Sequence, residues 1–129
     1  MKTKSPLMLM PLILAVLFVG CGKGWEMDYG KPAAQFHEQD LLVKGKNFVG
    51  KKITAKGVVK KVDTSDPDSA WIILSEGTRC NFGDFRAMAE SVKPGDTIYV
   101  DGFLKRCEKG EIVIDPAMSR DPKAHFEPK

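Results

Sequence analysis

The sequence has few of the residues and motifs on which enzymes commonly depend. Its 129 residues include 2 histidines, and no HExxH, CxxC, GxSxG or phosphate-binding P-loop pattern occurs. A serine or cysteine nucleophile needs a base such as histidine within hydrogen-bond reach. His37 and His125 both lie outside the central stretch, 48–118, that we expect to form the main domain. We therefore predict that the protein is not an enzyme and holds no metal ion or cofactor.

Neither sign of charge dominates the chain. Lys and Arg number 20 and Asp and Glu number 17, which gives a formal net charge of +3. Two of the basic residues, Lys2 and Lys4, belong to a segment that we expect to be removed, so the remaining chain would carry +1. A balance this close to zero gives no support to a nucleic-acid partner.

A long apolar run is also missing. The run from Leu7 to Val19 contains Pro11 and is shorter than the roughly 20 apolar residues of a membrane-spanning helix. It follows two lysines and precedes Gly20 and Cys21, which is the layout of an export signal. We predict a signal peptide over residues 1–20.

The stretch Phe18, Val19, Gly20, Cys21 resembles the lipobox of bacterial lipoproteins. The resemblance implies that the Cys21 thiol is acylated, palmitate being one such chain, and that Cys21 becomes the mature N-terminus. More than one acyl chain is enough for stable anchoring of a domain on a membrane that it does not span. The resemblance also favours the periplasmic face of the outer membrane, because Gly22 stands where inner-membrane lipoproteins commonly carry aspartate. In a source with a single membrane, the anchor would lie on its outer surface.

The mature chain falls into segments of different composition. Glycine-rich residues 21–32 suit a lipidated tether. Residues 33–44 lack Gly and Pro and predict a short helix, within a helix and linker region over 33–47. The main domain follows over 48–118, and an irregular, exposed tail over 119–129.

The main domain shows strand periodicity with one helical interruption. Apolar and polar residues alternate over 51–62, 71–76 and 96–105, with further short strands at 79–82 and 112–115. Residues 84–92 instead place apolar side chains at helical spacing, and Pro94 and Gly95 end that helix. Three strands, a helix and two strands is the element order of the OB-fold, a five-stranded barrel closed at one end by the helix between strands 3 and 4. We therefore predict a mainly β protein of this fold, preceded by the short N-terminal helix.

The stretches FVGKKITAKGVVKKV, WIILSEGTRCNF and VKPGDTIYVDGFL resemble the tRNA-anti-like OB domains of exported bacterial proteins and lipoproteins, over roughly residues 48 to 115. The family is largely uncharacterised, and the resemblance implies the fold without catalytic residues. It does not imply tRNA binding, because an OB barrel serves many functions.

Two cysteines remain once Cys21 is lipidated. Cys80 and Cys107 would lie in an oxidising compartment, where a disulfide can form. The alternative is two separate thiols, Cys80 as a small buried side chain and Cys107 near a turn. The sequence leaves both open.

Ligands of OB barrels commonly bind to strands 2 and 3 and to the adjoining loops. In this chain those regions hold the candidate binding residues Trp71, Arg79, Asn81, Lys105 and Arg106. An aromatic ring beside a guanidinium can stack on and pair with an anionic or sugar-like ligand, although Trp71 filling the barrel end beside a solvated Arg79 is the simpler alternative. Likewise, Lys51, Lys52, Lys56, Lys60 and Lys61 could attract anionic headgroups or form a solvated strand face.

The sequence thus predicts a lipid-anchored OB-fold binding module of the cell envelope. Its partner would be an envelope protein or a small or polymeric ligand. The alternatives are a structural or assembly accessory of an envelope complex and, third, a protein that binds single-stranded nucleic acid.

Overall fold

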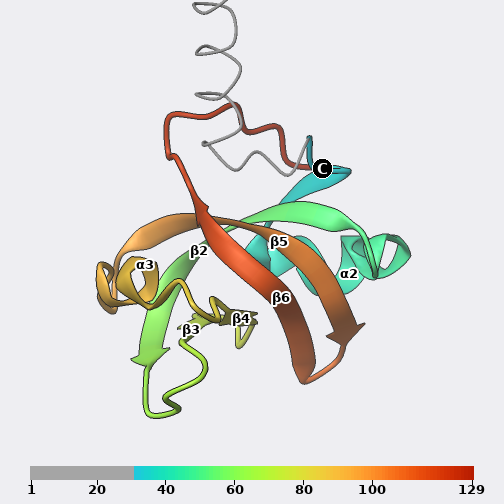
Figure 1. The fold of residues 1–129 in the computed structure, drawn as a ribbon. Helices are drawn as coiled ribbons and strands as arrows, with labels where there is room; N and C mark the ends of the chain where they lie inside the picture. Colours follow the sequence, from blue (N-terminus) through green and yellow to red (C-terminus); the bar gives the residue numbers. More distant parts are fainter. Residues whose placement is uncertain (1–30) are drawn as a thin grey trace, which may run out of the picture. The chain divides into compact units, whose positions relative to one another are not determined.

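The barrel is built around one long strand, β2. A computed structural model describes residues 31–129, of which Pro32–Lys129 form one compact unit (Figure 1). In chain order, its elements are β1 (Ala34–His37), the 3-10 turn η1 (Glu38–Asp40), α2 (Leu41–Lys44), the 3-10 turn η2 (Lys46–Phe48), β2 (Lys52–Asp63), β3 (Trp71–Leu74), β4 (Arg79–Asn81), α3 (Arg86–Glu90), β5 (Thr97–Glu108) and β6 (Glu111–Arg120).

Strand β2 takes part in both halves of the barrel because it is 12 residues long and changes neighbour along its length. Its first half pairs with β1 in parallel and with β5 in antiparallel orientation, from Lys52 opposite Phe103 to Val58 opposite Thr97. Its second half pairs with β3, after a register shift between Val59 and Lys61. Such an irregularity lets a strand bend sharply enough to serve two sides of a small barrel.

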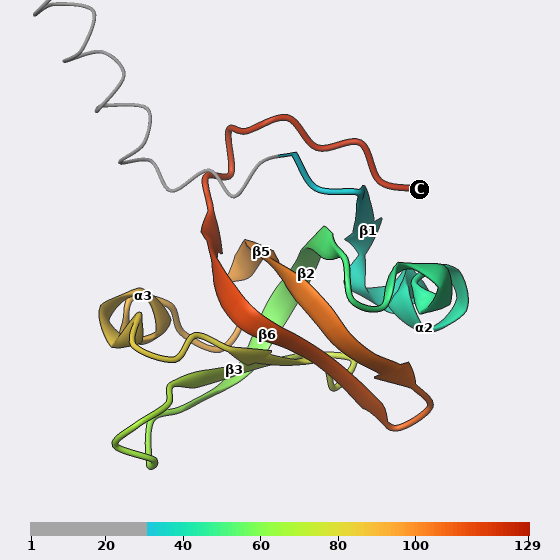
Figure 2. The same ribbon diagram turned by 45° about the vertical axis from the view of Figure 1, so that its right-hand side comes forward.

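The sheet closes on itself. Its strand order is β1-β2-β3-β4-β6-β5, and the additional pairing of β2 with β5 closes the strands β2 to β6 into a barrel, with β1 added at the side of β2 (Figure 2). Strand β4 runs parallel to β6, so the closed barrel of β2 to β6 is mixed. A mainly β structure with a closed five-stranded barrel and a short helix between its third and fourth strands confirms the predicted fold class.

The core consists of the inward-facing side chains of these strands. Ile53, Ile72, Leu74, Val100 and Ile114 are completely buried. Helix α3 adds Ala89, which is also completely buried, and the half-buried Phe85, Met88 and Val92 pack against this core from the α3 region. The helical spacing over 84–92 is thus correct, although the regular helix is limited to Arg86–Glu90.

The N-terminal helix predicted over 33–44 is only partly correct. Residues Ala34–His37 form β1, and the α-helix is limited to Leu41–Lys44. Ala34, Gln35 and Phe36 are all buried, and Ala34 and Phe36 lie opposite Ile53 and Ala55 of β2. Pairing with β2 therefore outweighs the local helical preference of a segment without Gly or Pro.

The C-terminal tail is irregular, as predicted, but it is not simply exposed. Its backbone crosses β1, where the Glu127 N–H donates to Gln35 Oε1 (2.6 Å) and the Lys129 N–H donates to the Gln35 carbonyl (2.9 Å). The Phe126 ring is half-buried, with its centroid 5.2 Å from that of Tyr99 and 5.5 Å from that of His37. Strand β6 extends to Arg120, so the tail itself begins at residue 121.

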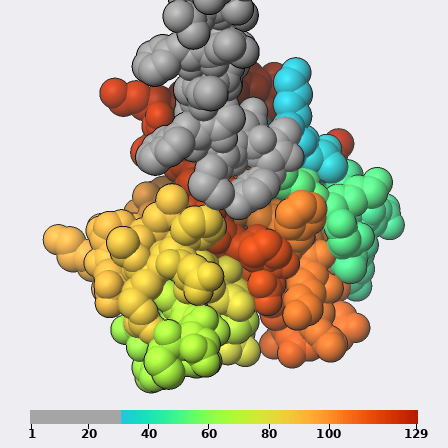
Figure 3. Space-filling model, in the orientation of Figure 1, coloured from blue at the N-terminus to red at the C-terminus, as the bar shows by residue number. Residues whose placement is uncertain are grey.

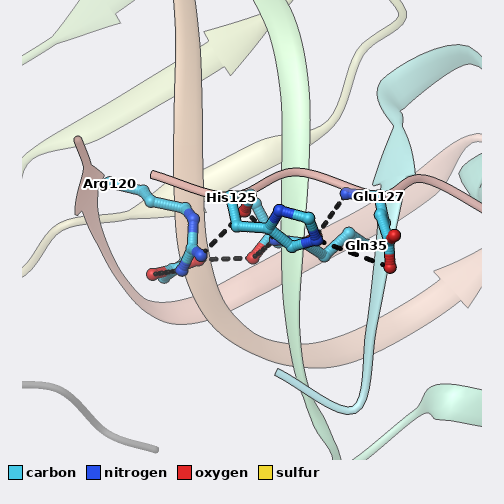
Figure 4. Close-up of polar contacts among 6 residues, drawn as sticks. Gln35, Arg120, His125 and Glu127 are labelled. Atoms are coloured by element: carbon cyan, nitrogen blue, oxygen red, sulfur yellow. Dashed lines mark hydrogen bonds and ion pairs between the residues drawn. The ribbon is translucent and has the colours of Figure 1, made fainter. Parts of the chain in front are cut away.

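A buried polar chain joins this tail to the barrel (Figure 4). Thr54 donates to Asp101 (2.6 Å), and Arg120 pairs with the other oxygen of the same carboxylate (2.9 Å). Gln35 Nε2 and Arg120 Nη2 both donate to the carbonyl of His125, at 3.2 and 3.0 Å. Side chains on β1, β2, β5 and β6 and the backbone of the tail are therefore joined in one network, in which the buried Nε of Arg120 is left without a hydrogen-bond partner among the described residues.

The predicted signal peptide, the lipidation residue Cys21 and most of the tether lie outside the described residues. Among the residues that the structure describes, no helix has the length and apolar character needed to cross a membrane.

Candidate binding face

The outward face of β3 and β4 carries three of the five candidate residues. Ile72 and Leu74 point into the core, so the alternation of β3 turns Trp71 and Ile73 outward. On β4, Cys80 is buried and its neighbours Arg79 and Asn81 face outward. Trp71 lies opposite Asn81, and Ile73 lies opposite Arg79. The four side chains thus form one continuous surface, which we call the β3–β4 face.

Arg79 stacks on Trp71. The guanidinium carbon is 4.5 Å from the centroid of the indole ring, well within the range of a cation–π contact. Trp71 is half-buried, whereas Arg79 is exposed. A stacked guanidinium keeps its N–H groups at the edge of its plane, where they can pair with a carboxylate or another planar acceptor.

Asn81 continues the β3–β4 face toward β6 and β5. Its side-chain amide donates to Asp115 (3.3 Å), and its oxygen accepts from the N–H of Gly83 (2.9 Å). Lys105 Nζ lies 3.7 Å from the same Asp115 carboxylate. The structure therefore brings together Trp71, Arg79, Asn81 and Lys105.

Arg106 is set apart from this group. Its guanidinium pairs with Glu111 at 3.3 Å across the β5–β6 hairpin, and both side chains are at least half exposed. The sequence grouped Arg106 with Lys105 because the two residues are adjacent. In the structure, β5 is irregular between Leu104 and Arg106, and Arg106 contacts Glu111 of the β5–β6 hairpin instead.

Carboxylates accompany the cations of this region. Asp63 lies opposite Trp71 at the end of β2. Hydrogen bonds from the Ser65 hydroxyl and N–H lower the pKa of Asp63, and the charges of Lys61 and Arg79 lower it further. With Asp63 opposite Trp71 and Asp115 beside Lys105, the surface presents both signs of charge near one aromatic stack.

Arg86 fixes the loop that borders the β3–β4 face. From α3, its guanidinium donates to the carbonyls of Thr64 (3.1 Å) and Asp66 (2.6 Å). Within the loop, Asp66 accepts from the N–H of Asp68 (2.8 Å). The sequence analysis did not identify Arg86, because its position in an amphipathic helix gives no sign of a contact 20 residues earlier.

Glu38 is a second residue that the sequence analysis missed. Its side chain comes from η1 and is 3% exposed, and its carboxylate accepts from the N–H groups of Glu76 (3.0 Å) and Thr78 (3.1 Å). These N–H groups belong to the turn between β3 and β4. Glu38 thus positions the hairpin from which Arg79 projects.

Cys80 and Cys107 are separate buried thiols in the structure. Cys80 on β4 lies opposite Ile114, and Cys107 on β5 lies opposite Ile112, so β6 runs between the two cysteines. Two strand spacings amount to about 9–10 Å, whereas a disulfide needs Cα atoms about 4.4–6.8 Å apart. Of the two alternatives that the sequence left open, the structure has the separate thiols.

Burial raises the pKa of both thiols, although their neighbours differ. Burial raises the pKa of Cys80 far above its usual value, and the Glu38 charge adds to this effect. Burial also raises the pKa of Cys107, whose Sγ donates to the Leu41 carbonyl at 3.2 Å. Both groups therefore favour the protonated form.

Comparison with known proteins supports the fold. No family model matches the chain, and no curated protein matches it either. Among solved structures, the chain is similar to a protein from Klebsiella pneumoniae described as a "putative nucleic acid-binding lipoprotein", with a TM-score of 0.54 and 11% sequence identity. The match covers 69% of this chain and 93% of that one. At this identity the similarity shows a shared fold.

Proposed function

We propose that the protein is a lipid-anchored, non-catalytic binding module of the bacterial cell envelope, and that its β3–β4 face binds a protein partner. The observation that carries this proposal is the exposed Arg79 stacked on Trp71, with carboxylates on both sides. The fold and the name of the Klebsiella protein are in keeping with a lipoprotein that binds a ligand.

The charge pattern favours a protein over a polyanion. Nucleic-acid binding depends largely on unpaired cations that neutralise phosphates. Lys105 already has Asp115 beside it, and Arg79 adds to the positive potential at Asp63. Tryptophan and arginine are instead enriched at the centre of protein–protein interfaces, and polar or charged side chains form the rim around them.

The experiment is site-specific photo-crosslinking in living cells. A photoreactive residue at Ile73, in the middle of the β3–β4 face, should capture one envelope protein, whereas the same residue at the exposed Ser91 should not. Trp71→Ala and Arg79→Ala should each reduce capture at least tenfold, while Arg106→Ala should leave it unchanged. If the partner is captured equally with all three variants, the chain is an accessory that packs through another surface.

Binding of single-stranded nucleic acid is the second candidate, since the Klebsiella protein is named for it and an aromatic–arginine stack can accept a base. The Trp25→Phe variant leaves Trp71 as the sole tryptophan. Titration with a single-stranded oligonucleotide should leave Trp71 fluorescence unchanged under the first proposal. Quenching that weakens steeply with added salt would instead favour the second candidate.

The anchor is tested independently of the partner. Mass spectrometry of the mature protein should find acyl chains on Cys21, and Cys21→Ser should release the chain from the membrane. We further propose the periplasmic face of the outer membrane as its location. Gly22→Asp should then move the protein to the inner membrane.

A further inference from the structure

A second surface lies around α2 and η2, away from the β3–β4 face. It contains two exposed valines, four lysines and a phenylalanine, and we call it the lysine–valine patch: Val43, Lys44, Lys46, Phe48, Val49, Lys51 and Lys129. Figure 3 shows the α2–η2 segment, in green, on the surface beside β5, in orange. Within residues 41–62, the chain has seven lysines and no aspartate or glutamate.

Two of the lysines lie over the ring of Phe48. The amino groups of Lys51 and Lys129 are 5.8 and 5.6 Å from the centroid of this ring. The amino group of Lys44 donates to the main-chain oxygen of Lys129 (3.0 Å), so a third lysine contacts the same residue of the tail. The ring itself is half-buried and packs edge-on against Phe36 at 5.5 Å, so this arrangement is fixed to the core.

The lysines of this patch form no ion pairs with aspartate or glutamate among the described residues. In the described part of the chain, none of the ion pairs with an Asp or Glu side chain involves Lys44, Lys46, Lys51 or Lys129. On the β3–β4 face, by contrast, Lys105 has Asp115 at 3.7 Å. Four lysines that lie close together without such ion pairs produce a local positive potential that the overall charge balance conceals.

The two valines of the lysine–valine patch are exposed to solvent. Val43 is 80% exposed, and Val49 is 47% exposed. Aliphatic side chains surrounded by lysines are characteristic of surfaces that lie in the interface of a bilayer, because the lysines contact phosphate headgroups while the apolar groups enter the headgroup region.

We propose that the lysine–valine patch docks the barrel on a bilayer surface rich in anionic headgroups. The proposal rests on the membrane anchor proposed above. Ala33, just before β1, donates its N–H to the Lys52 carbonyl (2.8 Å), so the chain enters the domain beside the start of β2, next to Lys51 in sequence. The 10 residues between Cys21 and Pro32 allow a separation of at most about 40 Å when fully extended, which keeps this end of the domain within reach of the membrane.

Lipid is favoured over nucleic acid as the occupant. Binding of single strands depends on exposed rings on which bases stack. In the patch, the ring of Phe48 is already covered by Phe36 and by two lysines, and the exposed side chains are aliphatic. Valine gains from entering a bilayer interface but offers a base no stacking partner.

The docking is tested with the full chain on vesicles. An environment-sensitive fluorophore is attached to Val49→Cys and, in a separate protein, to the exposed Ser91→Cys. On vesicles containing phosphatidylglycerol, the label at residue 49 should shift to shorter wavelength, whereas on pure phosphatidylcholine it should not. The emission of the label at residue 91 should remain that of a fluorophore in water on both kinds of vesicle.

Charge variants show whether the patch itself is responsible. Each lysine near an anionic surface strengthens binding about fivefold, so K44Q/K46Q/K51Q should lower the ratio of docked to undocked protein about 100-fold. The control K60Q/K93Q/K123Q removes three other exposed lysines and should have little effect. An equal loss in both triple variants would overturn the proposal, since the attraction would then be nonspecific.

Two further results would count against docking. One is a label at residue 49 that stays in water while flotation shows the protein on phosphatidylglycerol vesicles. The other is an equal spectral shift with an oligonucleotide in the absence of vesicles, which would make the patch a polyanion site. If the protein does not float with phosphatidylcholine vesicles, the anchor is wrong, and the label on phosphatidylglycerol vesicles still decides whether the patch docks.

Discussion

The carboxylate of Glu38 accepts a hydrogen bond from the backbone N–H of Thr78, at 3.1 Å, across 40 positions of sequence. Glu38 lies just after β1, and Thr78 lies just before β4. The N-terminal addition to the barrel therefore determines the position of the hairpin that carries Arg79, and the two parts of the molecule are coupled through one buried side chain.

Glu38→Ala should lower the free energy of unfolding by about 1–3 kcal/mol, because the N–H of the buried Thr78 loses its acceptor. Glu38→Gln keeps one acceptor oxygen and should lose less. Urea denaturation measures both, with the exposed Glu90→Gln as a control that should not change stability. Equal stability of all three variants would show that the contact contributes nothing.

The two arginine pairs on β5 and β6 should differ in strength. Arg120 and Asp101 have side chains 18% and 11% exposed, so Arg120→Ala leaves a largely buried carboxylate without its cation and should cost about 3 kcal/mol. Arg106 and Glu111 are 56% and 50% exposed, and Arg106→Ala should cost at most about 1 kcal/mol. Thermal unfolding of both variants checks the difference, and a similar cost for each would contradict the buried network of Figure 4.

The buried thiol of Cys80 should make stability fall in alkali. Since its pKa is raised in the folded state, its proton stays bound there after the unfolded chain has begun to lose its own, near pH 9. The contribution of the Cys80 thiol to the free energy of unfolding is fully present below that pH, and it declines by about 1.4 kcal/mol per pH unit above it. Urea unfolding of the wild type and Cys80→Ala between pH 7 and 10.5 should show curves that converge above pH 9. Parallel curves would mean that the thiol ionises equally in both states.

Gly102→Ala should disrupt the contact between β5 and β6. A Cβ at residue 102 would overlap the carbonyl oxygen of Pro116 and would lie 2.5 Å from Cγ2 of Ile114. A loss of about 3 kcal/mol is expected from the overpacking. The control is Gly77→Ala, where a Cβ meets open space and only the positive φ of 96° is unfavourable, at about 1–2 kcal/mol. An undiminished melting temperature for Gly102→Ala would show that β6 can shift.

Periodicity predicted the barrel because several of its strands alternate between buried and exposed side chains, most regularly in β3, where Trp71 and Ile73 alternate with buried Ile72 and Leu74. The sequence grouped Arg79 with Trp71 because ligands of OB barrels commonly bind to strands 2 and 3, and the structure places the two side chains in contact. Strand β1 was missed because both of its neighbours are remote: β2 pairs with it from residue 53 onward, and the tail reaches it from Glu127. The pattern of apolar and polar residues within a segment does not predict contacts with residues so far away in the sequence.

The same limit applies to individual side chains. Glu38 and Arg86 act on backbone groups that lie 20 to 40 residues away, and nothing in their own surroundings in the sequence distinguishes them from solvated charges. The sequence could not decide whether Cys80 and Cys107 form a disulfide, because an even number of cysteines permits one. Only the position of β6 between their strands shows that they are too far apart.

The order of events in folding follows from the way β2 is shared. The first half of this strand is completed by β5, and the Thr54–Asp101 hydrogen bond joins residues 47 positions apart. The Gln35–Glu127 contact spans 92 positions. Because contacts of large sequence separation form slowly, the barrel should fold on the millisecond-to-second scale typical of β topologies. A chain that emerges from a translocation channel with its N-terminus first would therefore hold β2 without β5, and β1 without the tail, until those later segments had followed.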